Sequence, residues 1–223
     1  MGGILCREKL NVKGHTAMVC HGEIIIERPV FMDGKSVISR NLSEHKQVID
    51  LLDGACGQAI EQIGTLFVDT LNNGGCIFWC GNGGSAADSQ HLAAELIGRF
   101  KNDRRALRSV ALSTDTSIIT SVANDFGYDD VFSRQVEGLG RKGDVLVGMT
   151  TSGNSENVLR AFKTANAMGI KTVALLGRGG GKAAGMADIS LVVPSDSTAR
   201  IQESHILIGH ILCELIEAGL GID

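Results

Sequence analysis

The chain has 223 residues, 43% of them hydrophobic, which is enough for one domain with a sizeable core. The formal net charge of −4, a pI near 5.9 and scattered basic residues argue against binding to nucleic acid. The six cysteines match no zinc or disulfide framework, no apolar run reaches the ~18 residues of a membrane span, and the N-terminus lacks the pattern of a secretory signal. These features predict a soluble, cytoplasmic protein that contacts no membrane.

Residues 1–31 show no sustained helix or strand period. Their one β-like run, Glu23 to Ile26, is short, and Met32 offers an alternative start. We expect residues 1–38 to form a poorly ordered arm in front of a single domain at 39–223. A strand-forming or partner-binding arm is the alternative.

The domain is expected to begin with a long helix. From Ser43 to Asn73 apolar residues recur at steps of three and four, which places them on one helical face. Two asparagines and two glycines, residues 72–75, then end the helix.

Short apolar runs alternate with helical patterns through the rest of the chain. Five runs are continuous and rich in β-branched residues, as strands covered on both faces are: 76–80, 108–113, 144–150, 171–176 and 188–193. This rhythm predicts an α/β fold with a five-stranded parallel sheet between helices, and ligands at the carboxyl ends of the strands. The last helix, from about Ala199 to Gly219, is apolar all round, so we expect it to be buried, in the core or against another subunit.

A glycine-rich stretch follows the first of these strands and leads directly into a helix. Gly83 and Gly84 allow a sharp turn, and the unpaired amides and dipole of a helix N-terminus attract an anion such as a phosphate. Asn82 and Ser85 flank the two glycines. The alternative is a tight connection in which Ser85 only caps the helix.

A second loop of this kind favours the phosphate interpretation. It follows the third strand, again precedes a helix, and supplies four hydroxyl groups, those of Thr150, Thr151, Ser152 and Ser155. Loops on strands of one parallel sheet can converge on one ligand at the same edge. The third glycine cluster, 177–182, is interpreted as a flexible connector.

Two other phosphate motifs are not supported. The first loop lacks the Lys followed by Ser or Thr of a P-loop, so nucleotide hydrolysis is not expected. Its glycines also do not follow the G-x-G-x-x-G spacing of a dinucleotide site.

Acid and imidazole groups accompany the loops. His91 and Glu95 are four residues apart and share a helical face with Asp88 close by, although a solvated face is the simpler explanation of such a stripe. His210 lies in the apolar last helix, where a buried imidazole needs a partner, and Gln202 precedes it by two turns. A carboxylate and a histidine beside a phosphate could move a proton between adjacent sugar carbons, which typically contributes ~10² to 10⁴ in rate.

Four separated stretches, 80–100, 123–140, 150–159 and 199–217, together resemble the phosphoheptose isomerases of the sugar isomerase (SIS) fold. The resemblance is collinear and covers roughly Ser43 to Ile222. It implies a three-layer SIS fold with a long N-terminal helix, and conversion of sedoheptulose 7-phosphate to D-glycero-D-manno-heptose 7-phosphate for lipopolysaccharide or capsule. It also implies a homotetramer whose active sites are shared between subunits.

The resemblance assigns roles to individual residues. It implies that Glu95 is the base that moves a proton between C1 and C2 through an enediol, and that His210 is its acid partner. The implied substrate-binding residues are Asn82, Gly83, Gly84, Ser85, Glu95, Asn124, Asp125, Thr150, Thr151, Ser152, Ser155 and Gln202.

A zinc ion, one per subunit, is also implied by the resemblance. The matching ligand positions are His91, Glu95, Gln202 and His210. A set of imidazole, carboxylate and amide is chemically acceptable for zinc. However, Gln202 and His210 are about 12 Å apart along a helix axis, so joint ligation requires long, converging side chains.

Three alternatives share the fold. The first is the non-catalytic SIS-domain protein that binds the bacterial replication initiator, but its matching positions do not keep both acid and imidazole, as Glu95 and His210 do here. The second is a sugar-phosphate-sensing module, against which the lack of a DNA-binding appendage counts. The third is an isomerase of pentose phosphates, but the matches around His91 and Gln202 favour the heptose phosphate isomerases.

Overall fold

The computed structural model describes residues 9–12, 15–20, 23–26 and 33–222, which fall into two compact units divided between Ser43 and Glu44. The first unit contains strands β1 (Lys9–Val12), β2 (His15–Cys20) and β3 (Glu23–Ile26), which pair antiparallel in the order β1-β2-β3. These strands agree with the strand-forming alternative for the arm. That the arm is poorly ordered stays a prediction.

Helix α1 (Gly34–Asn72) is longer than its sequence pattern predicts. It begins nine residues before Ser43, and the expected domain boundary between residues 38 and 39 therefore falls inside it. The Asp33 carbonyl accepts the first helical hydrogen bond, from the Val37 N–H. The large side chains of this extension are solvent-exposed, with Ile38 at 61% and Leu42 at 67%, so it lies outside the buried face that the rest of the helix presents.

The second unit is built on a five-stranded sheet, as predicted. Its strands are β4 (Ile77–Gly81), β5 (Ser109–Ala111), β6 (Val145–Thr150), β7 (Lys171–Leu176) and β8 (Ile189–Val192). All neighbours are parallel, in the order β5-β4-β6-β7-β8. The chain leaves β4 toward one edge and returns to β6 on the other side of β4. The carboxyl ends of β4 and β6 therefore form the switch point at which parallel sheets bind ligands.

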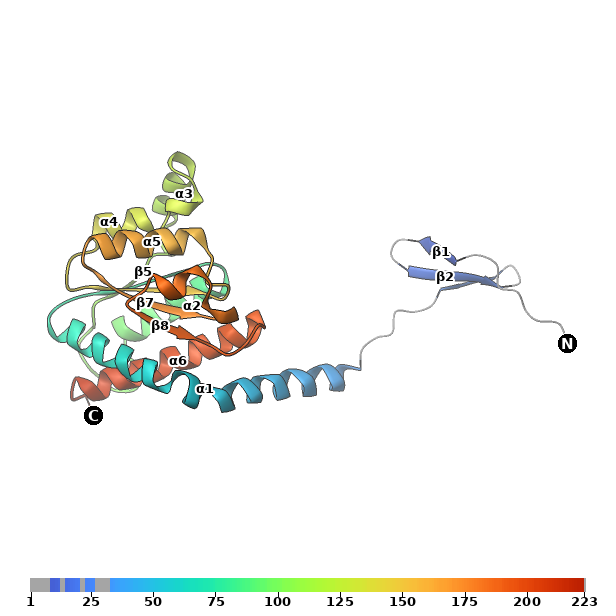
Figure 1. The fold of residues 1–223 in the computed structure, drawn as a ribbon, viewed down its shortest axis with the longest axis horizontal. Helices are drawn as coiled ribbons and strands as arrows, with labels where there is room; N and C mark the ends of the chain where they lie inside the picture. Colours follow the sequence, from blue (N-terminus) through green and yellow to red (C-terminus); the bar gives the residue numbers. More distant parts are fainter. Residues whose placement is uncertain (1–8, 13–14, 21–22, 27–32, 223) are drawn as a thin grey trace. The chain divides into compact units, whose positions relative to one another are not determined.

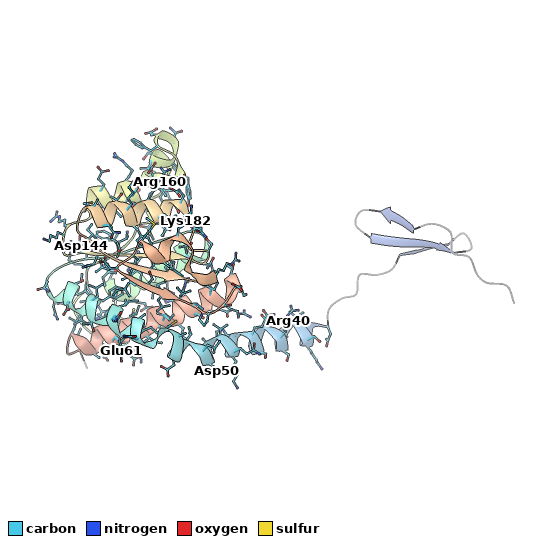
Figure 2. All side chains as sticks on the ribbon, in the orientation of Figure 1. Arg40, Asp50, Glu61, Asp144, Arg160 and Lys182 are labelled. Atoms are coloured by element: carbon cyan, nitrogen blue, oxygen red, sulfur yellow. The ribbon has the colours of Figure 1, made fainter. Side chains whose placement is uncertain are left out.

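Helices cover both faces of this sheet (Figure 1). Helices α2 (Gly84–Ile97) and α6 (Thr198–Gly219) pack on one face with the part of α1 from Glu44 on, around buried side chains that include Phe67, Trp79 and Ile208. The other face carries α3 (Thr116–Asp125), α4 (Ser133–Leu139) and α5 (Glu156–Ala167) around Phe132 and Phe162. Figure 2 shows the two sides through Glu61 on α1 and Arg160 on α5.

Short 3₁₀ helices complete the unit: η1 (Tyr128–Asp130), η2 (Arg178–Gly180) and η3 (Lys182–Gly185). Within the described residues, no helix combines the length and hydropathy that crossing a membrane requires.

Helix α6 differs from the expectation of complete burial. Its inner face is buried, but Ile211 is 37% and Leu215 is 36% exposed. These two side chains line an apolar groove with Ile49 and Leu52 of α1. Within one chain, α6 is therefore half covered, because α1 packs along only one side of it.

Candidate active site

The first glycine loop turns sharply from β4 into α2. Gly83 has φ 56° and ψ −119°, a backbone conformation that residues other than glycine rarely adopt. A Cβ atom at Gly84 would lie 2.5 Å from Nε2 of Gln202, so the α6 amide rests directly on this loop. The structure thus brings Gln202 to the start of α2. Ser85 is buried, at 3% exposure.

The second loop places its hydroxyl groups in mutual contact. Oγ1 of Thr150 lies 2.9 Å from Oγ of Ser155 and 3.4 Å from Oγ of Ser152. Ser155 precedes the first turn of α5 and makes no side-chain cap, so its hydroxyl faces the loop instead of the helix amides. Thr151 is half-buried beside them. The loop therefore presents the predicted group of hydroxyls at a helix N-terminus, where an anion is favoured.

The third glycine cluster, residues 177–182, packs against this second loop. Gly153 has φ 66°, and a Cβ atom there would overlap the carbonyl oxygen of Gly180. The Ala183 N–H donates to the Gly153 carbonyl at 3.0 Å, and the Lys182 N–H donates to Oδ1 of Asn154 at 3.2 Å. The connector is thus packed against the loop, which a reading of the glycines alone did not predict.

A pair of side-chain amides joins the two loops at the switch point. Asn82 and Asn157 exchange hydrogen bonds of 2.9 and 2.8 Å, and the Tyr128 hydroxyl donates to Oδ1 of Asn82 at 3.1 Å. Asn157 is buried in the first turn of α5. Sequence reasoning did not single out Asn157 or Tyr128, because nothing in their spacing indicates that they meet Asn82. The two loops, whose convergence the sequence did predict, are joined by these hydrogen bonds.

The predicted acid and imidazole groups form one cluster between α2 and α6. Nε2 of His91 lies 3.2 Å from Oε1 of Glu95 and 3.1 Å from Nε2 of His210. One ligand atom from each residue lies within 4.8 Å of the others. His210 is half-buried rather than fully buried as expected, and the Phe100 ring stacks on it at 5.5 Å with an interplanar angle of 25°.

This cluster suits a metal ion in its chemistry. Two imidazole nitrogens and a carboxylate oxygen converge, and two Nε2 atoms at 3.1 Å must share a proton or a cation to avoid opposing lone pairs. Three of the four predicted zinc ligands are thus brought together. The fourth, Gln202, is placed against Gly84, seven residues before His91, or about 10 Å along α2.

Asp88 lies one turn before His91 on α2. Burial raises the pKa of its carboxyl, and the nearby His91 lowers it to a smaller extent. Oδ2 of Asp88 is buried and has no hydrogen-bond partner among the described residues. The carboxyl is therefore a poorly solvated neighbour of the cluster and not part of it.

Asn124 and Asp125 lie shortly before Tyr128 in the chain, whose hydroxyl donates to Asn82 of the first loop. They end α3, are exposed, and hydrogen-bond to each other at 2.8 Å. Their role in substrate binding stays a prediction.

Comparisons with known proteins agree with this arrangement. A family profile described as the SIS domain matches residues 42–177. The phosphoheptose isomerase of Akkermansia muciniphila is 58% identical over 158 residues, covering 71% of this chain and 84% of its own. That of Helicobacter pylori is 51% identical over 181 residues, covering 81% and 94%.

Solved structures show the same similarity. The phosphoheptose isomerase of Neisseria gonorrhoeae aligns with a TM-score of 0.78 and 45% identity over 82% of this chain and 98% of its own. A phosphoheptose isomerase of Francisella tularensis aligns with a TM-score of 0.81 and 38% identity over 84% and 100%. The chain, with its two joined loops and its acid–imidazole cluster on a five-stranded parallel sheet, therefore belongs to the SIS domain family and, within it, to the phosphoheptose isomerases.

Proposed function

We propose that this isomerase converts sedoheptulose 7-phosphate to D-glycero-D-manno-heptose 7-phosphate through an enediol. The observation that carries the proposal is the placement of an acid–imidazole cluster and two joined loops at opposite ends of α2. An extended seven-carbon sugar with a terminal phosphate spans such a separation, so C1 and C2 would meet Glu95 while the phosphate would meet the loops.

The chemistry follows from the two groups that flank the sugar. The Glu95 carboxylate removes a proton from C1 of the ketose while His210 protonates O2, which gives the enediol. The O1 hydroxyl then returns a proton to His210, and Glu95 delivers its proton to C2, which leaves the aldehyde at C1. Both side chains finish in their starting protonation states, as a catalyst must.

The phosphate would be held without a lysine or arginine from the loops. Hydroxyls of Thr150, Thr151, Ser152 and Ser155, and the amides around Asn82, Gly83, Gly84 and Ser85, would donate to it. Gln202, which rests on Gly84, would contact the sugar between the two ends.

Zinc is part of the proposal. His91, Glu95 and His210 would hold it, and the Gln202 side chain would have to turn from Gly84 toward them to complete the set. A bound zinc ion would polarise the sugar carbonyl as a Lewis acid. The proposed assembly is a homotetramer in the cytoplasm that binds neither nucleic acid nor membrane. Its support is the half-covered α6, where Ile211 and Leu215 would be buried by another subunit.

The decisive experiment is an isomerisation assay with sedoheptulose 7-phosphate and the purified full chain, with and without a chelator. We expect formation of the aldose, its loss with chelator, and its absence in Glu95→Gln. Glu137→Gln, an exposed acid on α4, is the control and should be fully active. Full activity in Glu95→Gln would contradict the assignment of the base, and no turnover by the wild type would contradict the substrate.

A further inference from the structure

The segment that follows α2 is held by one buried ion pair. Nε of Arg104 lies 3.0 Å from Oε1 of Glu217, near the end of α6, and the two side chains are only 2% and 3% exposed. Burying two charges is costly unless their remaining hydrogen-bonding groups are satisfied. Here those groups are satisfied by backbone groups on both sides of the pair.

Glu217 fixes the backbone of this segment. Its two carboxylate oxygens accept hydrogen bonds from the N–H groups of Phe100, Lys101 and Asn102, each at 3.2 Å. Burial acts to raise the pKa of Glu217, but these three N–H groups and the Arg104 guanidinium outweigh it and hold the pKa below its usual value. Glu217 is thus a stable carboxylate at neutral pH.

Arg104 fixes the end of α2. Its guanidinium donates to the carbonyl oxygens of Glu95 at 2.8 Å and Leu96 at 2.9 Å, which lie in the last turn of the helix. The ion pair therefore ties the backbone of Glu95 on α2 to α6, the helix that carries His210.

The same segment places Phe100 on the cluster. The Phe100 ring stacks on the His210 imidazole, whose other neighbour is the His91 ring at 5.1 Å. The imidazole is thus held between an aromatic ring and the opposing histidine, which limits its rotation.

We propose that Arg104 and Glu217 are positioning residues for the isomerase: they hold Phe100 against His210 and set the separation of Glu95 from His210. This inference rests on the proposed function. Without the ion pair, the backbone of Phe100 would no longer be held by Glu217, and its ring would no longer restrain the His210 imidazole. The imidazole should then rotate more freely. Outer contacts of this kind typically change metal affinity or activity by about 10- to 100-fold.

The test compares Glu217→Gln with Glu214→Gln. Glu214 also lies on α6 and pairs with Lys101 of the same segment at 2.8 Å, but its side chain is 60% exposed, so it is a matched surface pair of little energetic weight. We expect Glu217→Gln to lower kcat about 10-fold with little change in KM, and to weaken Zn²⁺ binding by the metal-free protein about 10-fold in calorimetry. Glu214→Gln should change neither quantity more than about twofold.

If the pair has only a structural role, its removal should lower stability and leave kcat and Zn²⁺ affinity unchanged. If folded Glu217→Gln keeps the kcat and Zn²⁺ affinity of the wild type, the proposal is wrong. If that variant does not fold, Phe100→Leu decides: it should show the same two losses, Phe100→Tyr should restore both because it keeps the ring, and equal values for all three proteins would overturn the proposal.

The failure of the proposed function is recognisable separately. A wild type that leaves sedoheptulose 7-phosphate unchanged refutes that substrate, while its Zn²⁺ affinity relative to the variants still decides the positioning role. A wild type that isomerises the sugar but does not bind Zn²⁺ leaves kcat to decide. Absence of both overturns both proposals.

Discussion

Two histidines on α6, five residues apart, have opposite surroundings. His205 is completely buried, and its Nε2 donates to the Leu176 carbonyl at 3.1 Å. Its Nδ1 has no hydrogen-bond partner within the described residues. Burial lowers the pKa of His205 to about 4, and the bond to Leu176 opposes this to a smaller extent. The imidazole is therefore neutral, with its proton on Nε2.

His210 instead lies at the edge of the core and faces groups that could exchange protons or bind metal. It is half-buried, and its ring meets His91 and Phe100. The comparison teaches that the helix spacing alone does not tell a structural histidine from a functional one. The neighbours decide, and they come from β7 in one case and from α2 in the other.

The largest expected effect is a loss of turnover when His210 is replaced. His210→Asn removes the proposed acid and should lower kcat by about 10² to 10⁴, as loss of general acid–base assistance does. Its melting temperature should stay close to that of the wild type, because the site is half-exposed. His205→Gln, which keeps a donor at the Nε2 position, is the control and should retain most of kcat. Equal losses of kcat in both variants would contradict the assignment of His210 as functional and His205 as structural.

His205 should instead be visible in the dependence of stability on pH. Because its folded pKa of about 4 lies below the unfolded value near 6.5, protons bind preferentially to the unfolded chain between these values. This contribution is fully present above about pH 6.5 and is lost as the pH falls toward 4, by about 3 kcal/mol in the free energy of unfolding.

Urea denaturation of wild type and His205→Gln at several pH values between 7.5 and 4.5 measures this contribution. The variant should lose less stability across this range than the wild type. The lowered pKa of Glu217 acts in the same direction, but only below the unfolded glutamate pKa near 4.3, so it stays outside the range. Parallel curves for the two proteins would show that His205 is not buried as a neutral imidazole.

The smallest effect should come from the second loop, whose proposed role is only to bind the phosphate. Ser155→Ala removes one hydroxyl from the proposed phosphate site, and one hydrogen bond is typically worth about 0.5–1.5 kcal/mol, so KM should rise about 2- to 12-fold with kcat nearly unchanged. Steady-state kinetics beside His210→Asn would then separate binding from chemistry. An unchanged KM would exclude Ser155 from the phosphate site.

The sequence predicted the sheet because its strand signals are local. Each apolar run is long enough to be read by itself, and β7 begins and ends where expected. The loops were found for the same reason, since each is a short run of glycines and hydroxyl residues between a strand and a helix. The membership of Glu95 and His210 in one site was suggested by the family resemblance, not by their spacing.

Other features could not be predicted because they join distant residues without a pattern. The Asn82–Asn157 pair spans 75 positions and the Arg104–Glu217 pair 113. The half-exposed state of His210 also depends on the residues that pack around it, which its hydropathy does not report.

The sequence by itself determined the parallel sheet, its order of elements along the chain and the two strand-to-helix turns that are proposed to bind the phosphate, because each follows from the chemistry of neighbouring residues. Only the tertiary structure decided that His91, Glu95 and His210 share one point, that Gln202 rests on Gly84 and that Phe100 covers His210. The physical reason is that these contacts arise from how α2 and α6 pack against each other, and packing is set by side chains far apart in the chain.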